Sequence, residues 1–132
     1  MARHRRYQSE CYPTTRTSEK RTSVPPPEPL RGELWEVRFP SFGLHPAVVL
    51  SVNPMNARLG HAAVVPITGT CGPDGTDVPL GAEAGLTRYP ESYADITGLQ
   101  PVARSRFRRR RGLLASTELA HLEERIRIYL GL

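Results

Sequence analysis

Apolar and polar residues alternate along residues 32–39, and this period of two predicts a β-strand with one buried face. Residues 47–52 and 62–67 are nearly continuous apolar runs, which predict strands buried on both faces. Pro66 cannot donate a ladder hydrogen bond, so it indicates an edge position or a bulge. Further strands are predicted at residues 76–80, 92–97 and 110–114.

Helical signals stand at three places. Asn53 and Pro54 predict the N-cap and first turn of a short helix that Gly60 closes. Residues 102–107 are compatible with a single helical or 3₁₀ turn. The last element is predicted to be a helix capped by Ser116 or Thr117, because its apolar residues recur at helical spacing: Leu119, Leu122, Ile126, Tyr129 and Leu130.

Several short strands followed by a terminal helix predict a mainly β barrel or sandwich with helical additions. The chain has 132 residues, which leaves room for one compact domain. Residues 1–30 are rich in proline and basic residues and poor in aliphatic ones, so we expect a disordered tail. The folded domain is therefore expected over residues 31–132.

The charge of the domain is uneven rather than high. Residues 32–132 hold eleven basic and ten acidic groups, and six of the eleven arginines lie between Arg104 and Arg111. This cluster could hold phosphates, face a protein partner, or pair with acids of the terminal helix such as Glu123 and Glu124. We favour a structural or partner-facing role.

Several functional classes are disfavoured. The sequence has no membrane-length apolar segment and no secretory signal, which predicts a cytoplasmic protein. Cys11 and Cys71 are expected to be free thiols. The four histidines lack metal-ligand spacing, so no metal or other cofactor is expected.

The order of local motifs adds a resemblance. Arg-Gly-Glu-Leu-Trp-Glu-Val at residues 31–37 resembles the opening strand of the MazF/PemK family of toxins, and His-Pro-Ala-Val-Val-Leu-Ser at 45–51 resembles its second strand, which usually begins Arg-Pro. Further matches are residues 56–60, 65–68, 77–80, 105–107, 112–113 and the final Tyr-Leu-Gly-Leu. Their joint order makes the resemblance specific.

The resemblance implies an SH3-like barrel, a homodimer and a cognate antitoxin that blocks the RNA groove. It also implies metal-independent, sequence-selective cleavage of single-stranded RNA such as mRNA. In that family the 2′-hydroxyl attacks the adjacent phosphate and leaves a 2′,3′-cyclic phosphate and a 5′-hydroxyl.

The family places an arginine at the start of its second strand and a threonine or serine at the end of its third. Thr68 matches the second position, and its hydroxyl can donate to the anionic transition state. The first position holds His45, for which we expect a role in proton transfer. There are two alternatives: the catalytic site is weakened or inactive, or Arg38 or Arg58 supplies the positive charge of the missing arginine.

Three further residues are expected to contact RNA: Ser41, Arg58 and Thr70. The loop before His45 is short, which leaves substrate choice open. A protein of the same fold that poisons gyrase, or a degenerate regulator that only binds antitoxin, is the competing interpretation. A generic RNA-binding module without catalytic activity is a third interpretation.

Overall fold

The structure is a computed structural model that describes residues 27–70, 72–73, 75–81 and 92–132. Its elements, in chain order, are β1 (Glu33–Phe39), β2 (Gly43–Val49), α3 (Asn53–Leu59), β3 (His61–Thr68), β4 (Asp77–Leu80), β5 (Ser92–Asp95), the 3₁₀ turn η2 (Ile96–Gly98), β6 (Gln100–Ala103), the 3₁₀ turn η3 (Arg104–Arg106), β7 (Phe107–Leu113) and α4 (Ser116–Leu130).

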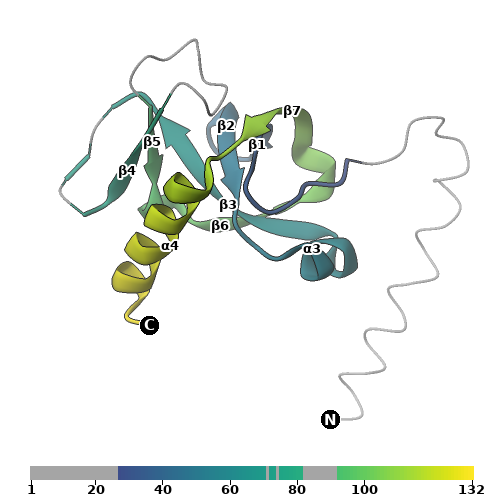
Figure 1. The fold of residues 1–132 in the computed structure, drawn as a ribbon. Coiled ribbons are helices and arrows are strands. Elements are labelled where there is room, and N and C mark those ends of the chain that lie inside the picture. The colour runs from purple at the N-terminus through teal and green to yellow at the C-terminus, as the bar shows by residue number, and fades with distance from the viewer. Residues whose placement is uncertain (1–26, 71, 74, 82–91) are drawn as a thin grey trace, which may run out of the picture.

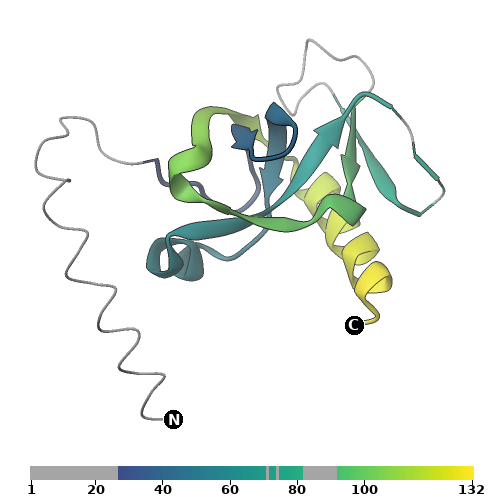
Figure 2. The same cartoon turned by 180° about the vertical axis from the view of Figure 1, so that it is seen from behind.

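The seven strands form one antiparallel sheet in the order β4-β5-β3-β2-β1-β7, and β6 pairs with the first half of β3. The strands curl around a common interior, while α4 lies along one side of the sheet and ends at the C-terminus (Figures 1 and 2). The prediction of a mainly β, SH3-like barrel with short helices and a C-terminal helix is confirmed.

Both faces of the central strands are buried because successive side chains point to opposite sides. One core cluster includes Leu34, Val48 and Val65, which pack with Leu122 of α4. The other includes Val37, Ala47 and Val64 in the barrel interior, with Phe107 of β7. This double burial explains the continuous apolar runs of β2 and β3.

Several element boundaries differ from the predicted ones. β2 begins at Gly43 rather than Ala47, so a turn of Pro40, Ser41 and Phe42 joins β1 to β2. The predicted helical turn at residues 102–107 is correct only for η3, since β6 precedes it and β7 already begins at Phe107. Exposed residues such as Pro101 and Ala103 give β6 little apolar pattern.

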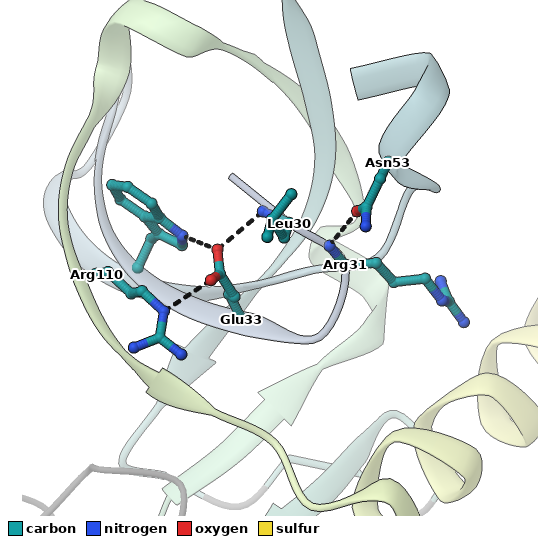
Figure 3. A network of polar contacts seen from close by, with 6 residues as sticks. Leu30, Arg31, Glu33, Asn53 and Arg110 are labelled. Atoms are coloured by element: carbon teal, nitrogen blue, oxygen red, sulfur yellow. Dashed lines mark hydrogen bonds and ion pairs between the residues drawn. The ribbon is translucent and has the colours of Figure 1, made fainter. Parts of the chain in front are cut away.

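The predicted N-caps are wrong by one or two residues. Helix α3 has Val52 as its N-cap, and the Asn53 side chain instead accepts a hydrogen bond of 2.7 Å from the backbone of Arg31 (Figure 3). Helix α4 has Ala115 as its N-cap, whose backbone N–H donates to Glu118 at 3.3 Å. Gly60 closes α3 in the left-handed conformation, as predicted.

Pro66 does not mark an edge strand, because β3 lies between β2 on one side and β5 and β6 on the other. The backbone N–H of Leu50 donates to the Ala63 carbonyl at 2.9 Å, so the backbone groups of Ala63 face the β2 side. Backbone groups of successive residues in a strand point to alternate sides, so the nitrogen of Pro66, three residues later, faces away from β2. On that side the pairing with β6 ends at Val64 and the pairing with β5 begins at Ile67. The missing N–H of Pro66 therefore falls where the partner strand changes.

The domain begins before Arg31. Pro29 is buried, and the Pro27 carbonyl accepts a hydrogen bond of 3.1 Å from the side chain of Arg104. The backbone of Leu30 donates to Glu33 at 2.8 Å (Figure 3). The disordered tail was predicted for residues 1–30, but residues 27–30 pack on the barrel. Residues 1–26 and the thiols of Cys11 and Cys71 lie outside the described residues.

The arginine cluster pairs with β1 rather than with α4. Arg110 contacts Glu33 at 2.7 Å and Arg111 contacts Glu36 at 2.5 Å. Glu123 of α4, which was a predicted partner, instead pairs with Arg31. The cluster is thus partly structural, because it ties β7 to β1. Within the described part of the chain, no helix is long and apolar enough to cross a membrane.

Candidate active site

A pocket of about 510 Å³ opens where β3 and β5 end and β4 begins. Its walls carry the hydroxyls of four threonines and the carboxylates of two aspartates, and the lining residues are Thr68, Thr70, Gly72, Pro73, Thr76, Asp77, Asp95 and Thr97. The structure thus brings together two of the predicted site residues, Thr68 and Thr70. We call this the Thr68 pocket.

Thr68 is the last residue of β3 and is half-buried. The preceding Ile67 is only 3% exposed in the core, so the strand holds the backbone of Thr68 firmly. Its hydroxyl donates to the Thr70 carbonyl at 2.9 Å, and the Thr70 N–H approaches the same oxygen at 3.4 Å. Because a hydroxyl proton rotates freely, this local turn leaves the Thr68 hydroxyl able to donate to a bound ligand.

Two carboxylates of the pocket, Asp77 and Asp95, were not among the predicted site residues. They face each other across β4 and β5, and neighbours such as Val78 and Ala94 point into the core. Asp95 accepts hydrogen bonds through Oδ1 from the Thr97 backbone at 3.1 Å and hydroxyl at 2.6 Å. The alternation of polar and apolar residues in β4 and β5 indicates that both carboxylates point away from the core. That they lie together follows only from the pairing of the two strands.

Thr68 and Asp95 are diagonal neighbours on one face of the sheet. Thr68 pairs with Tyr93, and Asp95 lies two residues further along β5 on the same side. Such diagonal positions lie about 7–8 Å apart, which is close enough for both side chains to contact one small group. The pocket can therefore offer a hydroxyl donor and a carboxylate acceptor to the same ligand.

His45 lies within β2 opposite Val37 and is exposed. The β2–β3 pairing ends at Ala47–Pro66, and extending its register by two residues places His45 opposite Thr68. Both side chains then point away from the core side marked by Val48 and Ile67, and neighbouring strands lie about 4.8 Å apart. His45 is not among the residues that line the Thr68 pocket, and the extended register alone relates it to Thr68.

The remaining predicted residues are more distant. Ser41 is in the exposed turn between β1 and β2. Arg58 lies in the last turn of α3, before the start of β3, whereas Thr68 is at the far end of that eight-residue strand. At about 3.3 Å per residue the strand spans about 23 Å, which an arginine side chain cannot bridge. Arg38 points to the opposite face from His45, since it pairs with Leu44.

The electrostatics of the site are unusual for an anion-binding pocket. No arginine, lysine or histidine is among the described residues that line the Thr68 pocket. The described residues also contain no cluster of three or more histidine, cysteine, aspartate and glutamate side chains that could hold a metal ion. The described residues that line this pocket therefore supply no positive charge to a bound phosphate.

Together, the curled antiparallel sheet, the C-terminal helix and the hydroxyl-lined pocket at the end of β3 define a small, mainly β, SH3-like barrel protein. Residues 30–130 match the family described as PemK-like, MazF-like toxin of type II toxin-antitoxin system. The chain therefore belongs to the MazF/PemK toxin family, as the motif order predicted.

Solved structures agree with this fold. An endoribonuclease in complex with its cognate antitoxin from Mycobacterial species superposes with a TM-score of 0.71 at 20% identity, covering 79% of this chain and 96% of that one. The Mycobacterium tuberculosis toxin MazF-mt6 superposes with a TM-score of 0.68 at 23% sequence identity, and the match covers 76% of this chain and 97% of that toxin. A MazE–MazF structure from Deinococcus radiodurans superposes with a TM-score of 0.69 at 23% sequence identity, and the match covers 80% of this chain and 98% of that one. Comparison with curated proteins gave no match.

Proposed function

We propose that this chain is an endoribonuclease toxin that cleaves single-stranded RNA, such as mRNA, without a metal ion and with sequence selectivity. The observation that carries the proposal is the Thr68 hydroxyl, held at a strand end in a pocket that also offers a carboxylate. Membership of the toxin family and likeness to endoribonucleases support it.

The proposed reaction is an internal transesterification. The 2′-oxygen attacks the adjacent phosphorus, the bond from phosphorus to the 5′-oxygen breaks, and the products are a 2′,3′-cyclic phosphate and a 5′-hydroxyl. Thr68 donates a hydrogen bond to a non-bridging oxygen as negative charge accumulates on it. A base must take the 2′-hydroxyl proton and an acid must supply one to the leaving oxygen.

Asp95 and His45 suit these two tasks because they flank Thr68 from the two strands beside β3. Asp95 lies on β5 and His45 on β2, so a phosphate at Thr68 has a proton acceptor on one side and a proton donor on the other. An in-line displacement needs the attacking and leaving oxygens on opposite sides of phosphorus. We assign the base to Asp95 and the acid to His45, which replaces the family's arginine. We propose that Thr70 in the pocket contacts the RNA, and that Ser41 in the turn between β1 and β2 makes a second contact.

Partners are proposed on the same basis. The structural relatives include an endoribonuclease with its cognate antitoxin and a MazE–MazF pair. We propose that this chain likewise binds a cognate antitoxin, forms a homodimer and acts in the cytoplasm. Exposed apolar side chains near the end of α4 fit a protein contact, namely Ile128, Tyr129, Leu130 and Leu132.

A non-enzymatic role is the second candidate, and one observation favours it. No cation is among the described residues that line the Thr68 pocket, so these residues give a phosphate no positive charge. A toxin of this fold that acts on gyrase, or a regulator that only binds antitoxin, needs no such charge.

Incubation of purified protein with a long single-stranded RNA in EDTA distinguishes the two functions. The proposal predicts a reproducible set of cuts whose downstream fragments accept a 5′-phosphate from a polynucleotide kinase without prior phosphatase treatment. Intact RNA would overturn it. Loss of DNA supercoiling by added gyrase in a parallel reaction would then support the gyrase-directed role.

A further inference from the structure

The turn between β1 and β2 carries an aromatic stack that the proposed chemistry does not use. The rings of Phe39 and Phe42 are stacked, with centroids 4.5 Å apart and planes 16° from parallel. His45 meets Phe42 edge-on at 5.1 Å. Phe39 is buried in the barrel interior, whereas Phe42 is 44% exposed, so the stack runs from the core outward to solvent.

Core packing alone does not require the exposed ring. One face of Phe42 covers Phe39, and its exposed area therefore belongs to the outer face and edge. Keeping a phenylalanine partly exposed at a turn costs hydrophobic free energy, since apolar area is more stable out of water. A flat aromatic ligand on the outer face would recover it and would extend the stack by one ring.

The position of Phe42 relates this surface to the Thr68 pocket. His45, which contacts Phe42, lies opposite Thr68 in the extended β2–β3 register. The ring of Phe42 lies 5.1 Å from the ring of His45, and His45 is one strand spacing of about 4.8 Å from Thr68 in that register. This separation suits the nucleotide next to the one whose phosphate sits at Thr68.

From this arrangement we infer that Phe42 is a nucleobase-stacking platform that binds a base adjacent to the scissile phosphate. The inference rests on the proposed endoribonuclease function and adds a binding subsite to it. The platform is insensitive to base identity, because every nucleobase has a π-face. It supplies affinity through stacking rather than through charge, which suits a pocket whose described lining residues include no cation.

The test begins by mapping where the wild-type protein cuts a long RNA. A fluorescent 2′-O-methyl oligonucleotide spanning one cut site cannot be cleaved and serves as the binding probe. Phe42→Ala is expected to weaken binding about 10- to 100-fold, the usual effect of removing a base-stacking ring. Phe42→Tyr keeps the ring and should bind like wild type, whereas Phe42→Leu keeps the apolar cover over Phe39 but should bind weakly.

Probes with an abasic position then show which base is stacked. One abasic position beside the cut should weaken binding to wild type about 10-fold or more and leave binding to Phe42→Ala unchanged. Leu59→Ala, an exposed apolar residue on α3, is the control and should match wild type on every probe. Equal binding by Phe42→Leu and wild type, or equal abasic effects in wild type and Phe42→Ala, would overturn the platform. Absence of any cut by wild type would instead overturn the proposed function.

Discussion

Replacement of Glu33 by alanine tests how the barrel is tied together. The Glu33 side chain is buried and accepts three hydrogen bonds, from Trp35 Nε1 at 2.9 Å, the Leu30 backbone at 2.8 Å and Arg110 Nε at 2.7 Å (Figure 3). It therefore connects the start of β1 to β7 and to residues 27–30.

The three contacts contribute unequally. Trp35 is 9% exposed, so losing its acceptor leaves a buried donor unsatisfied at a cost of about 1–3 kcal/mol. Leu30 and Arg110 are exposed enough to regain water, and we assign them about 0.5–1 kcal/mol each. The expected loss is about 3 kcal/mol for Glu33→Ala, or roughly 12–24 °C in Tm for a domain of this size. Thermal unfolding followed by circular dichroism measures it.

The effect also depends on pH. Burial raises the pKa of Glu33, but hydrogen bonds from Trp35 and Leu30 and the bond and charge of Arg110 outweigh it, so the pKa lies below the ordinary value of 4.5. The ionised carboxylate therefore stabilises the fold fully above that value, and the stabilisation is lost as pH falls through the lowered pKa. The stability gap between wild type and Glu33→Gln should be constant above about pH 5 and shrink in stronger acid. A Tm change below about 4 °C for Glu33→Ala, or a gap that grows in acid, would refute this role.

Three further predictions concern the site. Asp95→Asn should lower the RNA cleavage rate about 10²- to 10⁴-fold with little change in KM, because it removes the proton acceptor; equal rates would exclude it as the base. His45→Ala should abolish one limb of the pH–rate profile near neutrality, and an unchanged profile would exclude proton transfer by this histidine. Gly98→Ala would place a Cβ 2.6 Å from Cγ of Pro66, so the free energy of unfolding measured by calorimetry should fall by about 1–3 kcal/mol. The cleavage rate should also fall, because the neighbouring Thr97 of the pocket shifts. A variant as stable as wild type would contradict the clash.

Local pattern identified the elements whose burial is regular. β1 and β3 were predictable because their apolar residues alternate or run continuously into the core. β6 was missed because it pairs only with half of β3, and only Val102 of its four residues is buried. The start of β2 was missed because its first residues, among them Leu44 and His45, are exposed at the curled end of the barrel.

The site was predictable in part. Thr68 follows from the family motif, and its position at the end of β3 could be predicted from the apolar run before it. Asp77 and Asp95 are separated by eighteen residues and come together only through the pairing of β4 with β5, which no local pattern encodes. The pairing of Arg110 with Glu33 likewise depends on β7 lying beside β1.

The most direct test of the account is RNA cleavage by Thr68→Ala in EDTA, at equal concentration of folded protein. Thr117→Ala in the first turn of α4 is the matched control, because it removes the same hydroxyl from an exposed helical site far along the chain from β3. We predict that Thr68→Ala cuts at least about 100-fold more slowly at the same sites, as expected when a donor to the transition state is lost, and that Thr117→Ala cuts like wild type. Cleavage by Thr68→Ala at the wild-type rate would contradict the central claim.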